Sequence, residues 1–178
     1  MSNIEKDIHL LEHMISQMIV EQQVKLGYVK ETVRLYLPSS TLEGILQTSE
    51  LKEPLGRFCK EVQGRLGKVE ITRQGQRYCI AVPPEGGAYI HEHVKPTAFL
   101  VELIERFRHH GISISDVTDL FEKFSPDYVC EKQSGEEFNY LLYFRDKTID
   151  EYFYLVKFDG EHASYHRFTE HDVKDLLS

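Results

Sequence analysis

Cysteine is scarce in this chain. Its 178 residues include Cys59, Cys79 and Cys130, an odd number of cysteines that are widely spaced and form no Cys-x-x-Cys pair. A chain of this length buries well over half of its unfolded surface, so it needs neither disulfides nor a structural metal to fold. Cys59 and Cys79 lie within apolar patterns, and we expect both to be small buried side chains.

Long apolar runs are absent as well. The longest uncharged apolar run falls far short of the ~20 residues that a helix needs to span a bilayer. The first residues, MSNIEKDIHLLEHM, are charged from Glu5 onward and lack the basic segment and unbroken apolar core of a signal peptide. We therefore expect a soluble, reduced and cytoplasmic protein without a membrane partner.

Phosphate-binding and serine-nucleophile motifs are also missing. The sequence contains no GxxxxGK[ST], GxGxxG or GxSxG pattern, and residues 64–67 follow a predicted helix rather than a strand. These absences disfavour nucleotide-binding and serine hydrolase families. We predict a protein that is not an enzyme and that carries no cofactor.

The patterns that are present predict an α+β fold. The N-terminal half is helix-rich and ends in a hairpin, with residues 1–83 as one predicted domain. A helical interpretation competes with the first strand, because Val29, Val33 and Leu37 also recur at helical spacing. The elements expected in this half are a helix from residue 4 to Gly27, a strand at 32–37, a helix around 42–46, a helix from Ser49 to Gly67 and a hairpin of 69–72 with 78–82 around a turn at 74–76.

The second half is predicted to be helices packed on an antiparallel β-meander. Pro and Gly at residues 83–87 mark the strongest break in the chain, and we expect a polar linker up to Pro96. Residues 96–178 form the second predicted domain, although both halves could also be one continuous domain. The elements expected here are a helix from Pro96 to Gly111, a helix capped by Ser115, strands at 128–131, 138–144, 152–158 and 164–168, and a final helix over 169–177.

Positive charge is concentrated in residues 51–80. This stretch has seven basic residues against three acidic ones, a net charge of +4 in a chain whose net charge is −8. A solvated helix face with mixed Lys and Glu is the commoner explanation of such a pattern. The basic residues are Lys52, Arg57, Lys60, Arg65, Lys68, Arg73 and Arg77.

The element order over about residues 3–83 resembles that of a winged-helix domain. The resemblance implies that residues 51–66 occupy the position of the recognition helix and residues 74–76 the tip of the wing. It also implies a DNA-binding regulator, although such domains serve as protein-binding modules too. The residues then expected to contact phosphates are Arg57, Lys60, Arg65, Lys68, Arg73 and Arg77.

Aromatic residues are concentrated in the predicted meander. From Asp116 onward there are fifteen acidic residues against seven basic ones, which favours a basic protein partner over nucleic acid. Tyrosine suits an interface because its apolar ring carries a polar tip. The leading hypothesis is therefore a non-enzymatic protein-interaction or regulatory module, and the DNA-binding regulator is the alternative. The tyrosines expected to contact a partner are Tyr140, Tyr152, Tyr154 and Tyr165.

Histidines form three short motifs that raise a third hypothesis, a metal-dependent hydrolase. Residues 9–13, HLLEH, resemble the H-x-x-E-H pattern of inverted zinc metallopeptidases, but the acidic third ligand of such an enzyme has no clear place here and a half-buried structural histidine is the favoured interpretation. Residues 91–93, HEH, resemble a cupin metal motif without its glycine spacing, and we expect a polar linker there. His162, His166 and His171 gather near the C-terminus. We predict no metal at any of the three.

Overall fold

The computed structural model describes residues 3–177 and has the predicted α+β fold. Within these residues there are seven helices and two antiparallel sheets. The chain divides into two compact units, the first ending at Pro96 and the second beginning at Thr97. Among the described helices, none has both the length and the apolar character required to cross a membrane.

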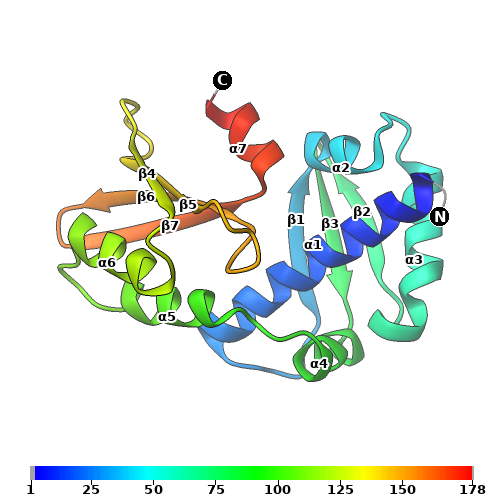
Figure 1. Ribbon diagram of the computed structural model, residues 1–178. Coiled ribbons are helices and arrows are strands. Elements are labelled where there is room, and N and C mark those ends of the chain that lie inside the picture. Colours follow the sequence, from blue (N-terminus) through cyan, green and yellow to red (C-terminus); the bar gives the residue numbers. More distant parts are fainter. Residues whose placement is uncertain (1–2, 178) are drawn as a thin grey trace. The chain divides into compact units, whose positions relative to one another are not determined.

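The first unit combines a helical layer with a three-stranded sheet (Figure 1). The strands pair antiparallel in the order β1-β3-β2, so the last strand of the hairpin lies in the middle. Its elements are α1 (Asn3–Leu26), β1 (Val33–Pro38), α2 (Ser39–Leu46), α3 (Lys52–Leu66), β2 (Glu70–Gln74), β3 (Arg77–Val82) and α4 (Pro84–His93).

The core of this unit lies between α1, α3 and one face of the sheet. The stripe of α1 that recurs at helical spacing is buried, as predicted, and so are Leu35 and Leu37 of β1. Because these alternate strand positions face inward together, residues 33–38 form a strand and the competing helical interpretation is wrong. The α1 and α3 residues of the core are Ile8, Leu11, Ile15, Ile19, Leu55, Phe58, Val62 and Leu66.

Helix α4 replaces the linker that the sequence predicted after Pro83. Pro84 occupies the first turn, where a missing N–H costs nothing, so this proline starts a helix rather than preventing one. Gly86 lies so close to α3 that a Cβ atom there would overlap the Leu66 carbonyl oxygen. Gln23 of α1 also donates a hydrogen bond from Nε2 to the Gly87 oxygen at 3.0 Å. The glycines therefore allow tight helix packing and do not mark a loop.

The second unit confirms the predicted meander. Its four strands pair antiparallel in the order β4-β5-β6-β7, each with its neighbour in sequence. Ser113 caps α6 in a capping box with Asp116, in place of the Ser115 cap that was predicted. The elements are α5 (Ala98–Phe107), α6 (Ile114–Phe124), β4 (Tyr128–Lys132), β5 (Tyr140–Phe144), β6 (Phe153–Asp159), β7 (His162–Phe168) and α7 (Glu170–Leu177).

Both faces of this sheet carry apolar side chains. One face packs against α5 and α6 through a cluster that includes Phe99, Phe121, Leu142 and Tyr154. The other face contributes Phe138, Leu141, Phe153 and Leu155 to a smaller cluster that Val173 of α7 joins. The alternation of a strand explains why neighbouring residues of β5 and β6 belong to different clusters.

Candidate functional site

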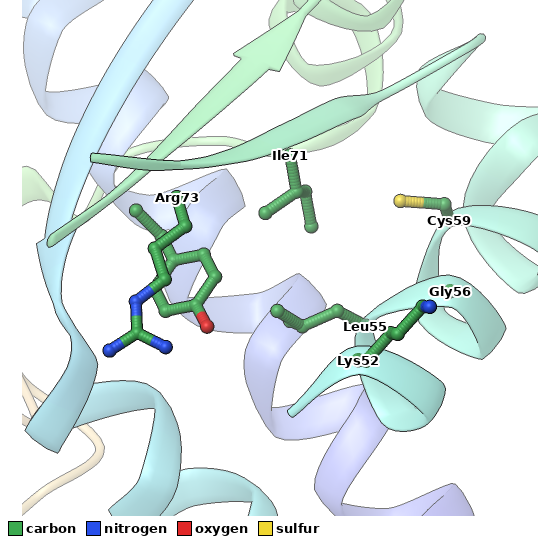
Figure 2. A pocket seen from close by; sticks show the side chains of 7 residues that line it. Lys52, Leu55, Gly56, Cys59, Ile71 and Arg73 are labelled. Carbon is green, nitrogen blue, oxygen red and sulfur yellow. The ribbon is translucent and has the colours of Figure 1, made fainter. Parts of the chain in front are cut away.

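A groove of about 370 Å³ lies between the first half of α3 and the β2–β3 hairpin (Figure 2). This volume lies within the range of small-ligand pockets in proteins, near its lower end. In Figure 2 Leu55 of α3 and Ile71 of β2 approach the groove from opposite walls, and Arg73 lies at one side. The lining residues are Lys52, Leu55, Gly56, Cys59, Ile71, Arg73 and Tyr78.

Helical and strand spacing bring these residues to one place. Residues three, four and seven positions after Lys52 share its side of α3, which places Leu55, Gly56 and Cys59 beside it. On β2 the alternate residues Ile71 and Arg73 share one face. Arg73 is opposite Tyr78 of β3 in the antiparallel register. The groove is therefore built entirely from the helix-hairpin unit.

The floor of the groove is apolar. Leu55 is buried and Ile71 and Tyr78 are half-buried against the core of the first unit. Cys59 is half-buried too, and burial raises the pKa of its thiol above the ordinary value. A raised pKa keeps the thiol protonated near neutral pH, so Cys59 serves as a small hydrophobic side chain. Gly56 leaves open space in the α3 wall, since a Cβ atom there would meet nothing within 4 Å.

Cations border this floor. Lys52 and Arg73 line the groove, and the Arg73 guanidinium carbon lies 5.9 Å from the centre of the Tyr78 ring. Arg73 also donates from Nε to the Gly75 oxygen at 3.0 Å, which holds its side chain along the turn. Lys60 and Lys68 are exposed on the same helix-hairpin unit. Among residues 3–177, none of these four cations forms an ion pair with an acidic side chain.

Two of the predicted phosphate-binding arginines are engaged within the protein. Arg65 donates to both carboxylate oxygens of Glu12 on α1, from Nε at 3.0 Å and from Nη2 at 2.5 Å. Glu12 is 18% exposed, so this bidentate pair lies partly out of solvent. Arg57 pairs with Glu61 at 3.2 Å and with Glu5 at 4.0 Å. Both arginines therefore hold α3 to its surroundings.

The hairpin separates the other predicted cations. Residues Arg73 and Arg77 lie on opposite faces, because Arg73 pairs with Tyr78 and Arg77 with Gln74 in adjacent register positions. The Arg77 guanidinium carbon lies 5.5 Å from the centre of the Tyr36 ring, on the face away from the groove. Of the six basic residues predicted to contact DNA, only Arg73 lines the groove, and Lys60 and Lys68 are exposed elsewhere on the helix-hairpin unit.

The four tyrosines predicted to contact a partner lie on the core side of the second sheet. Tyr154 is fully buried and Tyr152 is 7% exposed, so these two residues are out of reach of a partner. Tyr140 and Tyr165 are half-buried against the same cluster, with the Tyr165 ring 5.2 Å from that of Phe107. The prediction that these tyrosines form an exposed aromatic face is wrong, because Tyr152 and Tyr154 are buried and Tyr140 and Tyr165 pack against the same core cluster. All four tyrosines lie on the same face of the sheet, the face that α5 and α6 cover.

The histidine motifs have structural surroundings. Glu12, the acidic residue of HLLEH, accepts both hydrogen bonds of Arg65. His91 stacks on Tyr28 at 4.3 Å and His93 on Tyr89 at 4.2 Å, both from helix α4 rather than from an extended linker. Within residues 3–177, no three His, Cys, Asp or Glu side chains are grouped so as to hold a metal ion.

Most of the groove was missed by the sequence analysis. Lys52 entered only as part of a charge count, and Leu55, Ile71 and Tyr78 were expected to be ordinary core or strand residues. Gly56 is the one local signal, since a glycine within a helix costs stability relative to alanine and calls for an explanation. The groove also depends on how α3 packs beside the hairpin. The residue spacing within α3 or within the hairpin does not predict this packing.

The fold and groove define an α+β protein with a basic-rimmed groove on a helix-hairpin unit. The chain belongs to the family described as "Domain of unknown function, E. rectale Gene description (DUF3877)", whose sequence model matches residues 8–177. No curated protein matches the chain, and no solved structure does.

Proposed function

We propose that this protein is a non-catalytic cytoplasmic binding module of a regulatory kind, and that its groove binds an acidic segment of a protein partner. The observation that carries the proposal is the groove itself, an apolar floor bordered by Lys52 and Arg73. Apolar area supplies affinity and cations select an acidic ligand, which is the usual division of labour in protein recognition.

The chemistry of the lining suits binding rather than catalysis. Proton transfer near neutral pH needs a group that titrates there, and a nucleophile needs an activated form. Within residues 3–177, Lys52 and Arg73 are exposed basic side chains without an acidic partner that could share in acid–base chemistry. Burial raises the pKa of the Cys59 thiol, which disfavours the nucleophilic thiolate.

The proposed role is still protein interaction, but the proposed site is now the groove of the helix-hairpin unit. The sequence placed that role on the tyrosines of the acidic half and favoured a basic partner. Tyr152 and Tyr154 lie in the core and are not available to form that surface. The helix-hairpin unit, with its net positive charge, favours an acidic partner instead.

Charge reversal at the groove tests the proposal. The probe is a fluorescein-labelled nine-residue peptide with a central Leu, Glu two residues to either side and Thr elsewhere, followed by fluorescence anisotropy. The double variant Lys52→Glu and Arg73→Glu is expected to weaken binding by about tenfold, because two attractive contacts are replaced by repulsive ones. Lys30→Glu, an exposed lysine before β1, is the matched control and should bind normally. Equal affinity of both variants would overturn the proposed site.

A DNA-binding regulator is the second candidate, favoured by topology. The order helix, strand, helix, helix, strand, strand and the sheet order β1-β3-β2 resemble a winged-helix domain, with α3 in the place of the recognition helix. Lys60 is exposed on α3 and Lys68 leads into the hairpin. These cations support contacts with phosphates, because they are not engaged by acidic side chains.

The matching experiment is anisotropy of a labelled mixed-sequence duplex at low and near-physiological salt. Affinity that falls steeply with salt supports this candidate, and Lys60→Glu should then lower the slope of log K against log salt by about 1. Arg57 and Arg65 are poor choices for this test, since their ion pairs with α1 would break as well. Absence of binding at low salt would remove the DNA-binding candidate.

A further inference from the structure

We infer that the partner segment binds as an additional β-strand along β2, with one apolar side chain in the groove. This inference rests on the proposed function, because it specifies how the same groove is used. Within the described residues, β2 pairs with β3 on one side only and is therefore an edge of the first sheet. An edge strand presents unpaired peptide groups that another extended chain can meet.

The edge is accessible where the groove lies. Glu70, Thr72, Arg73 and Gln74 of β2 are exposed, and only Ile71 is half-buried. In Figure 1 helix α3 is drawn beside β2, on the side away from β3. The groove opens between α3 and the hairpin face that carries Ile71, Arg73 and Tyr78, and it borders the free edge because β2 is the edge strand. A strand bordered by a helix in this way is a known geometry for capturing extended peptides.

The side chains of β2 specify what the added strand should contain. Ile71 and Arg73 share one face and are two residues apart, so the facing residues of an added strand are also two apart. An apolar residue opposite Ile71 and an acidic residue opposite Arg73 make favourable cross-strand pairs. Lys52 supplies a second cation on the α3 side of the groove. The pattern apolar-x-acidic is thus the expected motif.

Gly56 makes room for the apolar residue. It faces the groove from α3 between Leu55 and Cys59, and a Cβ atom at this position would meet nothing within 4 Å. A side chain from the added strand can therefore contact Leu55 and Ile71 without displacing the helix. A larger residue at position 56 should occupy that space itself.

Two glycines on α3 provide a matched pair of variants. Gly56→Leu fills the groove, whereas Gly64→Leu adds the same side chain at an exposed α3 position that does not line it. A Cβ atom meets nothing within 4 Å at either helical glycine, so both variants should keep or raise the melting temperature. With the labelled peptide, Gly56→Leu is expected to weaken binding at least about tenfold and Gly64→Leu to leave it unchanged. Equal affinity of the two variants would overturn the role of position 56.

Backbone chemistry tests the strand addition separately. Copies of the peptide methylated at single backbone nitrogens should lose affinity at every second residue, since alternate N–H groups of an added strand face β2. Amide hydrogen exchange of the protein should slow within β2 on binding, and exchange in β4 of the second unit serves as the internal reference.

The outcomes distinguish strand addition along β2 from the proposed binding of an acidic partner segment. Binding that needs Lys52 and Arg73 but tolerates every backbone methylation, without protection of β2, keeps the acidic-partner function and overturns strand addition. Absence of peptide binding, together with salt-dependent binding of the DNA duplex, overturns both in favour of the nucleic-acid candidate. A peptide with Lys in place of each Glu must bind at least about tenfold more weakly, and equal binding would refute charge selection.

Discussion

The Tyr154 hydroxyl donates a 2.9 Å hydrogen bond to Oδ1 of Asp150, and both side chains are buried. The same oxygen accepts from the Tyr152 backbone N–H at 3.0 Å, and Oδ2 accepts from the Thr97 hydroxyl at 3.0 Å. Thr97 is the N-cap of α5 and accepts from the Leu100 N–H. Asp150 therefore ties the start of β6 to the start of α5.

Removing this carboxylate should destabilise the second unit. Asp150→Ala leaves the donors of Tyr154, Tyr152 and Thr97 without their acceptor in a buried place, and the expected loss is about 2–4 kcal/mol. Chemical denaturation followed by near-UV circular dichroism measures it. Asp119→Ala, an exposed position on α6, is the control and should lose little or no stability. A loss below about 0.5 kcal/mol for Asp150→Ala would contradict a structural role for the network.

Asp150 should also make stability depend on pH. Burial raises the pKa of this carboxyl above its ordinary value, while the hydrogen bonds from Tyr152, Tyr154 and Thr97 lower it less. The folded state then binds the proton more tightly than the unfolded state. The contribution of Asp150 to the free energy of unfolding is therefore fully present below the ordinary aspartate pKa and is lost as pH rises through the raised value.

The comparison with Asp150→Asn isolates this effect. Asparagine can still accept from Tyr154 and Tyr152 but does not titrate. We expect the difference in free energy of unfolding between the native protein and the variant to fall as pH rises from the ordinary aspartate pKa through the raised pKa of Asp150. The contributions of other carboxyls cancel in this difference. A difference that stays constant with pH would contradict the raised pKa.

Replacing glycines of the first unit with alanine should lower stability at one position and raise it at two others. A Cβ atom at Gly86 would overlap the Leu66 carbonyl oxygen, so Gly86→Ala must push α4 away from α3 and should cost about 1–3 kcal/mol. Gly56→Ala and Gly64→Ala meet nothing within 4 Å and should each stabilise the protein by about 0.5–1 kcal/mol. Thermal unfolding of the three variants checks the signs, and a stabilised Gly86→Ala would contradict the close packing of α4.

The Arg65–Glu12 pair should contribute modestly to the packing of α1 on α3. Arg65 is 40% exposed, so solvent screens the pair and a double-mutant cycle with Arg65→Gln and Glu12→Gln should give a coupling of about 0.5–1 kcal/mol. The coupling should shrink in high salt. A coupling that is zero at low salt would show that the two hydrogen bonds add nothing to stability.

Elements with long periodic patterns could be predicted from the sequence. Secondary structure was predicted correctly for the apolar stripe from Ile8 to Ile19 and for the strands of the meander. Burial on one face gives a helix or a strand its characteristic spacing of apolar residues, and that spacing can be recognised in the sequence. The segment after Pro83 could not be predicted in this way. Its Pro and Gly residues are typical of turns, and only contact with the Leu66 carbonyl explains why glycine serves a helix there.

The candidate site was harder to predict than the fold. Strand alternation tells that Tyr152 and Tyr154 share a face, yet it does not tell which face the helices cover. Charge counts located the basic helix-hairpin unit, but they did not separate Arg65, held by Glu12, from Lys52 and Lys60. Those distinctions arise from contacts between residues that are distant in the chain.

The charge at Arg73 also bears on the solubility of the protein. A free strand edge with no proline invites the same edge of another copy, which is a common start of aggregation. When two β2 edges meet antiparallel about Thr72, Arg73 of each copy lies opposite Ile71 of the other copy and diagonal to its Arg73, so a charge faces an apolar side chain and the two arginines repel. Arg73→Leu would remove this charge and is expected to make the edge more prone to pairing with its own copies.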